Sequence, residues 1–347
     1  MASDLRLEWI REQADAALTR HFTQQLEQTE LECADLVRRV LPDIIAGKHM
    51  RSSFCYWSYR AAGGTSEQAV WDACAALETG HYVVLVHDDI IDKDDVRRSA
   101  PSAHRRFADL HIRSGGRGIP ATYGTGTALL LGDLLLPWAD TFLAASPVPE
   151  PVIHRLLAAH RRMYREGIYG EILELRLQAD RDFRLDQCRR VAHYKGGRWC
   201  TIAGIFGALL AQAPPEETAV FDRFGELVGE AYQLRDDLIG VFGDPKISGK
   251  PAISDLREGK PTSLIALALH HATPAEVHRL RRLYGDPDLN EPQAQEIRSI
   301  MRGCGAVTEL EKLIARTHDA ALDTLRTLPG NTEELRQLAE LAIFRQK

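Results

Sequence analysis

The sequence predicts an all-α protein, a single large helical bundle, on two observations. Long segments between proline and glycine breaks have helical periodicity, and few segments alternate between apolar and polar residues as strands do. The chain has 347 residues, of which 44% are hydrophobic, so it can bury a sizeable core. We expect one domain over residues 1–347, because no repeat, low-complexity tract or long linker interrupts it.

Three segments predict long helices. Residues 66–92 contain β-branched side chains that would also suit a buried strand, but about 25 residues without proline are too many for one strand. We therefore predict one long, mostly buried helix, with Ser66 as its N-cap residue. Residues 152–179 also run without proline. After Pro215 an apolar stripe recurs at intervals of three and four residues: Val220, Phe224, Leu227, Ala231, Leu234 and Leu238.

The composition limits the kinds of partner. A net charge of −6 argues against general nucleic-acid binding, so anionic ligands must be held by local basic clusters. No apolar run approaches the ~18 residues of a membrane span, and the charged N-terminal segment lacks the apolar core of a signal peptide. We therefore expect no membrane span and a cytoplasmic location.

The first acidic cluster ends the helix predicted over residues 66–92. Asp88 and Asp92 lie one helical turn apart, with Asp89 beside them. Oxygen ligands of this kind suit Mg²⁺, which typically takes one or two carboxylates plus substrate phosphates. A solvated acidic helix end is the alternative, but the apolar residues 83–86 favour acids at the mouth of a buried space.

The second acidic cluster lies on the helix after Pro215. Gln233, Asp236, Asp237 and Gly240 share one side of that helix and flank its apolar stripe. Two Asp-Asp pairs on long apolar helices suggest acids that face each other across a central cavity. Two unrelated surface patches are the alternative.

Basic residues accompany both acidic clusters. Several lie beside glycine or proline, where phosphate oxygens can approach both the side chain and the backbone. They are Lys48, Arg51, Arg97, Arg98, Lys195, Lys246, Lys250, Arg257 and Lys260. Taken singly, each would most often be a solvated surface charge.

Together these segments resemble the motifs of the polyprenyl synthetase family, the trans-prenyl diphosphate synthases. HDDIIDKDDVRRSAP resembles its first aspartate-rich motif and YQLRDDLIGVFGD its second. AGKHMR, GTALLLGDLLL, YGEILE and HYKGG resemble further motifs in the right order, over roughly residues 46–264. His81, seven residues before Asp88, matches the histidine of the family's homoallylic site.

The resemblance implies a Mg²⁺-dependent prenyltransferase that joins isopentenyl diphosphate to an allylic diphosphate, and a homodimer. It implies that Mg²⁺ is bound by Asp88, Asp89, Asp92, Asp236 and Asp237. It assigns the allylic diphosphate to Arg97, Lys195, Lys250 and Lys260. It assigns isopentenyl diphosphate to Lys48, Arg51, His81 and Arg98. Gln233 would lie near the developing cation.

Several positions depart from the family pattern. Gly240 stands where the family often has a third aspartate, and it is open whether the following Asp244 compensates. Gly196 replaces a threonine and His49 an arginine. Glu171 and Glu174 stand for glutamine and aspartate.

The product length depends on the helix before Asp88. In this family an aromatic residue four or five positions before the first aspartate closes the cavity early. Here those positions hold Val84 and Val83, and Gly80 leaves room one turn deeper. We expect geranylgeranyl diphosphate (C20), with C15 and C25 or longer products open.

Two other functions compete with this one. A class I terpene cyclase shares the fold and the first motif, but its second metal-binding motif differs from Arg235-Asp236-Asp237. It also has no use for an isopentenyl diphosphate site. A regulatory subunit of a heteromeric synthase is favoured only by Gly240.

Overall fold

The computed structural model describes residues 5–45, 47–243 and 253–345, and the all-α prediction is confirmed. Within those residues the strands are β1 (Val96–Arg97) and β2 (Ala100–Pro101), which pair as one short antiparallel hairpin. The chain divides into two compact units, Met1–His160 with Ile205–Pro214 and Arg161–Gly204 with Pro215–Lys347. One domain around a central cavity stays a prediction.

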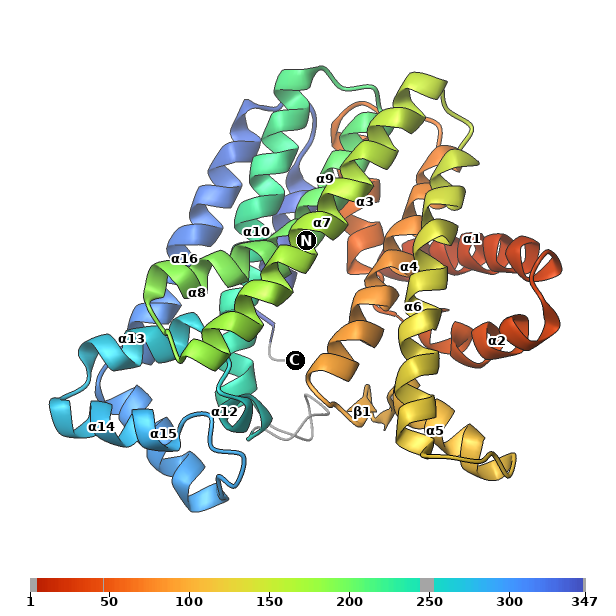
Figure 1. Cartoon of the computed structure of the whole chain (residues 1–347). Helices are drawn as coiled ribbons and strands as arrows, with labels where there is room; N and C mark the ends of the chain where they lie inside the picture. Colours follow the sequence, from red (N-terminus) through yellow and green to blue (C-terminus); the bar gives the residue numbers. More distant parts are fainter. Residues whose placement is uncertain (1–4, 46, 244–252, 346–347) are drawn as a thin grey trace. The chain divides into compact units, whose positions relative to one another are not determined.

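The first unit is built around one buried helix. Its elements are α1 (Leu7–Glu27), α2 (Leu31–Ile45), α3 (Met50–Ala61), α4 (Gln68–Ile91), the hairpin, α5 (Ala103–Arg113), α6 (Pro120–Ala144), the start of α7 (Glu150–Asp180) and the end of α9 (Arg198–Leu210). Helix α4 packs against α1, α3 and α6 and leads to β1 (Figure 1). Every residue from 69 to 80 is buried, because α4 has apolar or small side chains on nearly all sides.

The helix predicted over residues 66–92 is confirmed, but its predicted N-cap residue is wrong. The helix begins at Gln68, and Glu67 precedes it without a side-chain capping bond. The Tyr59 hydroxyl accepts a hydrogen bond from the Ser66 N–H at 2.8 Å and donates one to the Ser66 carbonyl at 2.6 Å. The backbone of Ser66 is therefore bound to α3, outside the helix.

A glycine allows α4 and α6 to pack closely near the first acidic cluster. A Cβ atom on Gly132 would lie 2.2 Å from Nε2 of His87. That nitrogen lies 3.2 Å from the carbonyl oxygen of Leu129, so the ring spans the two helices. The segment GTALLLGDLLL therefore contributes a packing contact directly before Asp88.

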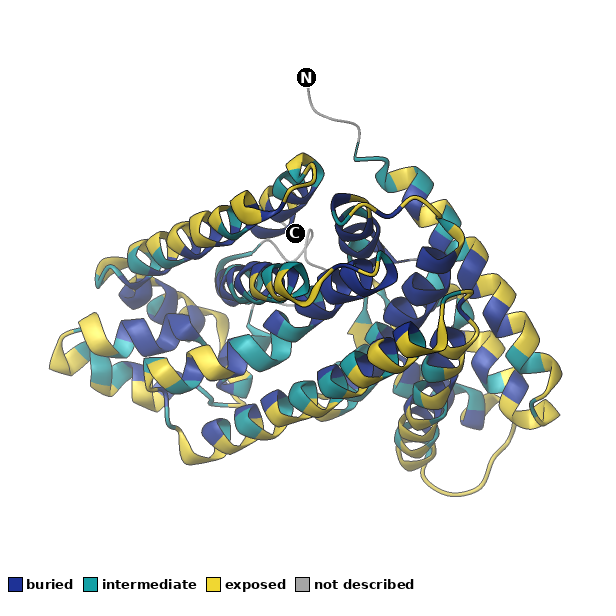
Figure 2. Cartoon of the chain, turned by 90° about the horizontal axis from the view of Figure 1, so that it is seen from above, coloured by how far each residue is buried: buried dark blue, intermediate teal, exposed yellow. Residues whose placement is uncertain are grey.

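By length and composition alone, α6 could cross a membrane. Core helices pass the same test, and 44% of its most apolar 18-residue window is buried. The helix packs against α4 and α5, and its buried side contains Ala128, Leu131, Leu135, Trp138 and Phe142. One such helix is weak evidence for a span. Many helices have a buried and an exposed side of this kind (Figure 2).

The second unit is built around α10 (Pro215–Phe242), which packs against α16 and other helices. The remaining elements are the rest of α7 and α9, α8 (Leu185–Ala192), the π-helical turn η1 (His193–Gly197), α12 (Ser254–Glu258), α13 (Ser263–His271), α14 (Pro274–Leu283), α15 (Glu291–Gly303), α16 (Ala306–Thr324), η2 (Leu325–Thr327) and α17 (Glu333–Ile343). The stripe predicted on α10 is buried except at Val220, where Phe221 faces the core instead. The predicted helix over residues 152–179 corresponds to α7.

Candidate functional site

The first acidic cluster forms the C-terminal end of α4. Asp92 is the C-cap residue, and its N–H donates to the Asp88 carbonyl at 2.8 Å. Asp89 is buried, whereas Asp88 is half-buried. The Arg97 Nε donates to Oδ1 of Asp89 at 2.7 Å, and a terminal nitrogen of Arg97 donates to Oδ2 of Asp88 at 3.3 Å. Burial lowers the pKa of Arg97, but the hydrogen bond to Asp89 and the charges of its acidic neighbours raise it overall.

The β1–β2 hairpin separates the two adjacent arginines. Arg97 pairs with Ala100, and the two turn residues Arg98 and Ser99 both have positive φ, as a tight two-residue hairpin requires. Arg97 reaches the acids of α4, whereas Arg98 donates to the Asp43 carbonyl of α2 at 3.1 Å. The sequence analysis did not predict this hairpin. It gives the two arginines different surroundings within the first unit.

A second cluster of the first unit brings Arg51 of α3 close to His81 of α4. Burial and then the charge of Arg51 lower the pKa of His81 well below its usual range, so this ring is neutral near pH 7. The charges of Arg98 and Arg97 act on the ring in the same direction. Lys48 lies exposed before α3. Three of the residues assigned to isopentenyl diphosphate, Arg51, His81 and Arg98, therefore lie close enough for the two charges to act on the ring.

The buried ring of His49, beside this cluster, contacts one acidic residue of α1 and one of α4. Its Nε2 lies 2.7 Å from Oδ1 of Asp15 in α1, and its Nδ1 lies 3.2 Å from Oε2 of Glu78 in α4. Burial lowers the pKa of His49, but the hydrogen bonds and charges of Glu78 and Asp15 raise it overall to about 9. The protonated ring therefore supplies the positive charge that an arginine supplies in the family pattern.

Glu78 is a site residue that the sequence analysis did not identify. Burial would raise the pKa of Glu78, but the hydrogen bond from His49 and the charges of His49 and Arg51 lower it to about 2. Its Oε1 accepts bonds from the Ser52 N–H at 3.1 Å and the Ser52 hydroxyl at 2.7 Å. Glu78 thereby fixes the start of α3, which carries Arg51.

The second acidic cluster lies near the C-terminal end of α10. Asp237 is buried, and it accepts bonds from the Ser263 N–H at 3.0 Å and from the Gln233 side chain at 3.5 Å. Burial raises the pKa of Asp237 well above its usual range, and the nearby Asp236 and Asp255 add to this. Asp236 forms an ion pair with Arg345. The sequence analysis identified neither Asp255 nor Arg345.

Lys195 lies on the π-helical turn η1, a local distortion that is frequent at functional sites. Its Nζ lies 2.9 Å from Oε2 of Glu171 and 3.0 Å from Oε1 of Glu174. A Cβ on the next residue, Gly196, would lie 2.7 Å from the Cβ of Gln233. This close approach explains why glycine replaces the family's threonine, and it places Gln233 against the residue that follows Lys195.

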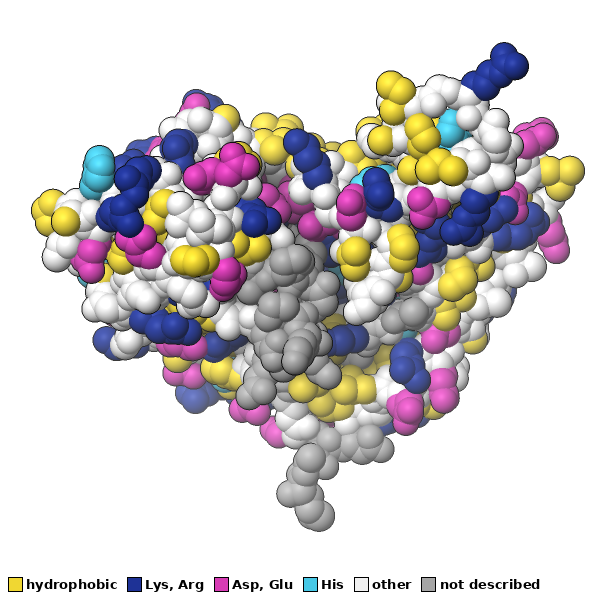
Figure 3. Space-filling model, turned by 90° about the horizontal axis from the view of Figure 1, so that it is seen from below, with side chains coloured by type: hydrophobic (Ala, Val, Ile, Leu, Met, Phe, Trp, Pro, Cys, Tyr) yellow, Lys and Arg dark blue, Asp and Glu magenta, His cyan; other side chains and the backbone are white. Residues whose placement is uncertain are grey.

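Of the other predicted residues, Lys260 follows α12, and Gly80, Val83 and Val84 lie on α4. The Nζ of Lys260 lies 3.3 Å from Oε2 of Glu258, and Lys250 lies outside the described residues, as do Lys246 and Asp244. On α4, Gly80 and Val83 are buried and Val84 is half-buried. On the face seen from below, lysine and arginine side chains lie in small groups beside acidic ones (Figure 3).

The acidic clusters fit a metal that binds together with a diphosphate. Within the described ranges no three His, Cys, Asp or Glu side chains form a group that could hold a metal ion alone. Each cluster instead contacts a guanidinium, Arg97 in one and Arg345 in the other. Because Mg²⁺ usually completes its shell with phosphate oxygens and water, one or two carboxylates per ion are sufficient.

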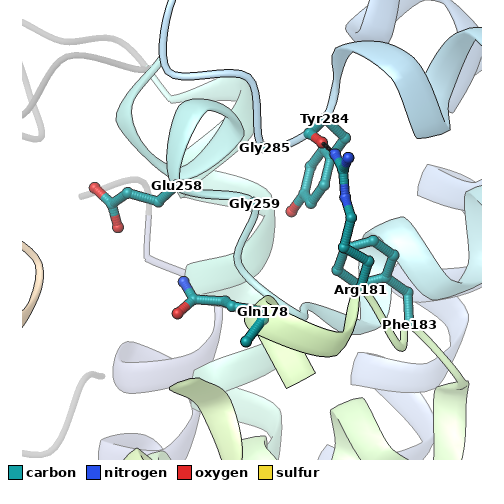
Figure 4. Close-up of a pocket in the computed structure, with 8 residues that line it drawn as sticks. Gln178, Arg181, Phe183, Glu258, Gly259, Tyr284 and Gly285 are labelled. Carbon is teal, nitrogen blue, oxygen red and sulfur yellow. Dashed lines mark hydrogen bonds between the residues drawn. The ribbon is translucent and has the colours of Figure 1, made fainter. Parts of the chain in front are cut away.

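One small cavity, of about 210 Å³, lies in the second unit. It is lined by Gln178, Ala179, Arg181, Phe183, Glu258, Gly259, Tyr284 and Gly285 (Figure 4). The Tyr284 hydroxyl donates to the Lys260 carbonyl at 2.6 Å. The cavity contains none of the predicted site residues and is smaller than a usual ligand pocket. We do not assign it to a substrate.

Comparisons with known proteins agree with the motifs. Residues 34–301 match the sequence model of the polyprenyl synthetase family. The geranylfarnesyl diphosphate synthase of Aeropyrum pernix is 29% identical over 301 residues, which cover 86% of this chain and 88% of that one. The nonaprenyl diphosphate synthase of Mycobacterium tuberculosis is 30% identical over 312 residues, which cover 88% and 85%.

A solved structure is also similar over nearly the whole chain. The geranylgeranyl pyrophosphate synthase of Corynebacterium glutamicum, complexed with isoprenyl diphosphate and magnesium, has a TM-score of 0.91 at 31% identity. The alignment covers 98% of this chain and 99% of that one. The three relatives are named for three different products, so the product of this chain has to be argued from its own residues.

Proposed function

We propose that this chain, which belongs to the polyprenyl synthetase family, joins isopentenyl diphosphate to an allylic diphosphate and makes mainly all-trans geranylgeranyl diphosphate (C20). Membership of this family makes it a prenyltransferase. The observation that carries the proposal is that each acidic cluster contacts a basic side chain of its own unit, Arg97 beside Asp88 and Asp89, and Arg345 beside Asp236. Carboxylates for a metal and cations for a diphosphate are what this chemistry requires.

The acids are proposed to hold Mg²⁺, the metal with which the similar Corynebacterium synthase is complexed together with isoprenyl diphosphate. The ligands would be Asp88, Asp89, Asp92, Asp236 and Asp237. Bound Mg²⁺ stabilises the negative charge that develops on the leaving diphosphate. Arg97 and Lys195, with Lys250 and Lys260, bind the same diphosphate from the protein side. Each has a fixed positive charge suited to phosphate oxygens.

Isopentenyl diphosphate is assigned to Lys48, Arg51, His81 and Arg98. Because His81 is neutral near pH 7, it binds a diphosphate oxygen as a hydrogen-bond donor and adds no charge. Arg51 supplies the charge, from a helix start that Glu78 fixes. Gln233 lies against Gly196, the residue after Lys195, and we assign it to the developing allylic cation.

The C20 product is argued from α4. Gly80 and Val84 lie on the same side of this helix as Asp88, at intervals of four residues. Neither side chain is large, so a prenyl tail can extend beyond three isoprene units. Val84→Phe and Val83→Phe should shorten the main product. Val84 is the more informative site, because Val83 is buried and a larger ring there would overpack the core.

A homodimer is part of the proposal. Helices α5 and α6 of the first unit, with the residue that precedes α6, leave several large apolar side chains exposed: Ile112, Ile119, Tyr123, Leu129 and Leu130. Apolar groups of this kind often mark a protein contact. We assign this surface to a second copy of the chain and place the enzyme in the cytoplasm. Leu130→Glu should convert the dimer to a monomer in light scattering. A wild-type monomer would contradict the assignment.

Product analysis tests the function. The purified chain is incubated with Mg²⁺, isopentenyl diphosphate and, in turn, dimethylallyl, geranyl or farnesyl diphosphate. We expect a C20 diphosphate from each primer and none after chelation of the metal. A hydrocarbon from the allylic diphosphate alone would indicate a terpene cyclase, and no product at all would indicate a regulatory subunit.

A further inference from the structure

The second acidic motif has a glycine at the position where the first has its third aspartate. Asp88 and Asp92 are four residues apart on α4, as are Asp236 and Gly240 on α10. On a helix this spacing places two side chains on one face, one turn apart. The second motif, Asp236-Asp237-x-x-Gly240, therefore lacks one carboxylate within its own helix.

The carboxylate of Asp255 lies in the space that a side chain on Gly240 would occupy. A Cβ atom built on Gly240 would lie 1.9 Å from Oδ2 of Asp255 and 3.0 Å from its Cγ. Among the described residues outside the backbone of α10, the nearest atoms to that position all belong to Asp255. A side chain at residue 240 and the present Asp255 carboxylate thus exclude each other, and glycine is what permits this arrangement.

The backbone holds Asp255 in place. Its helix α12 ends at Gly259, which has φ of +68°, and the N–H groups of Gly259 and Lys260 donate to the Asp255 carbonyl at 3.1 and 3.3 Å. The next residue, Leu256, is fully buried, and its carbonyl accepts from the Gly285 N–H at 2.8 Å. Helix α12 also packs against α10. The approach of Asp255 to Gly240 is therefore built into the second unit.

Two further observations connect Asp255 to the acidic cluster. Its charge acts on the buried Asp237 together with that of Asp236. Among the described residues, no side chain donates a hydrogen bond to the Asp255 carboxylate. Three carboxylates that repel one another are expected where a cation binds between them.

We propose that Asp255 supplies the third carboxylate of the second acidic motif and ligates, directly or through water, the divalent cation that this motif binds. The proposal rests on the proposed function for the identity of the cation as Mg²⁺. It also explains why a glycine at residue 240 is compatible with an active enzyme.

Metal binding tests the proposal without relying on turnover. Free Mn²⁺ is followed by electron paramagnetic resonance in the presence of the full chain and inorganic pyrophosphate, with circular dichroism to verify folding. Asp255→Asn should weaken Mn²⁺ binding about tenfold or more, as loss of a ligand or of its supporting carboxylate typically does. The matched control is Asp244→Asn, at the next acidic residue after Gly240. It should change the affinity for Mn²⁺ by less than about twofold.

A swap provides the second test. Asp255→Ala combined with Gly240→Asp returns the carboxylate to α10. The Asp255 Cβ would lie 3.7 Å from a Cβ on residue 240, an ordinary contact, so the double variant has room to fold. It should bind Mn²⁺ more tightly than Asp255→Ala alone and approach the wild-type affinity.

The proposal is overturned if folded Asp255→Asn binds Mn²⁺ like the wild type, if Asp244→Asn carries the loss instead, or if the folded swap regains nothing. Its failure is distinct from that of the proposed function. A wild-type chain that binds Mn²⁺ and pyrophosphate through Asp255 but makes no prenyl product would refute the proposed function and leave this inference standing.

Discussion

The two acidic motifs are built in different ways. The first has three aspartates at the end of one buried helix, and its cation, Arg97, comes from the hairpin that follows. The second has two aspartates on α10, a third carboxylate that approaches from α12, and Arg345 from far along the chain. A motif can therefore be complete in space while it is incomplete in sequence.

Loss of either motif should have the largest effect. Asp88→Ala and Asp237→Ala should each lower turnover by about a thousandfold or more, because each removes several kcal/mol of transition-state charge stabilisation. Steady-state kinetics with saturating Mg²⁺ measures this. Asp95→Ala, at an exposed acid near the first motif, is the control. Near-normal turnover in either variant would refute the metal assignment.

The basic residues should then separate by the substrate that they bind. Arg51→Ala and His81→Ala should raise KM for isopentenyl diphosphate, whereas Lys195→Ala should raise KM for the allylic diphosphate. A hydrogen bond to a charged group stabilises by about 1.5–3 kcal/mol, which corresponds to about ten- to a hundredfold in KM. The opposite pattern would show that the two diphosphate sites are assigned the wrong way round.

The guanidinium of Arg345 should compete with the metal for Asp236. The pair is partly exposed, with Asp236 39% and Arg345 16% accessible, so its removal should tighten Mn²⁺ binding by no more than about fivefold. Arg345→Ala is compared with Arg345→Lys, which keeps the charge, in the Mn²⁺ titration followed by electron paramagnetic resonance. Weaker binding in Arg345→Ala would mean that this arginine supports the metal site.

The pH dependence of stability should reveal His49. Its pKa is about 9 in the folded protein and 6.5 as the reference, so its stabilising effect is complete below pH 6.5 and is lost as the pH rises through 9. The groups around it are Asp15 of α1, Glu78 and His81 of α4, and Arg51 of α3.

His49→Arg is the comparison for this prediction, because an arginine keeps its charge at pH 9. The melting temperature of the wild type should fall between pH 6.5 and 9 by more than that of His49→Arg. Parallel curves for the two proteins would show that His49 does not titrate in this range.

The sequence predicted what depends on local spacing. The long helices, the apolar stripe of α10 and the placement of Asp88, Asp89 and Asp92 at a helix end follow from periodicity. The contacts that it missed join segments that no spacing rule connects. The Asp255 carboxylate against Gly240 and the His49 ring between Asp15 and Glu78 depend on how separate helices pack.

Gly196 illustrates the same limit. The sequence showed a departure from the family pattern there, and the approach of Gln233 supplied its reason. The β1–β2 hairpin was missed because two residues per strand are too few to show an alternating pattern.

A crystal structure of the chain with Mg²⁺ and inorganic pyrophosphate tests the central claim most directly. The account predicts Mg²⁺ at each acidic motif, with Asp88 among the ligands at the first and Asp237 among those at the second, and with Asp255 directed at the ion of the second motif. Metal ions at only one motif, or a pyrophosphate bound without Mg²⁺, would contradict it.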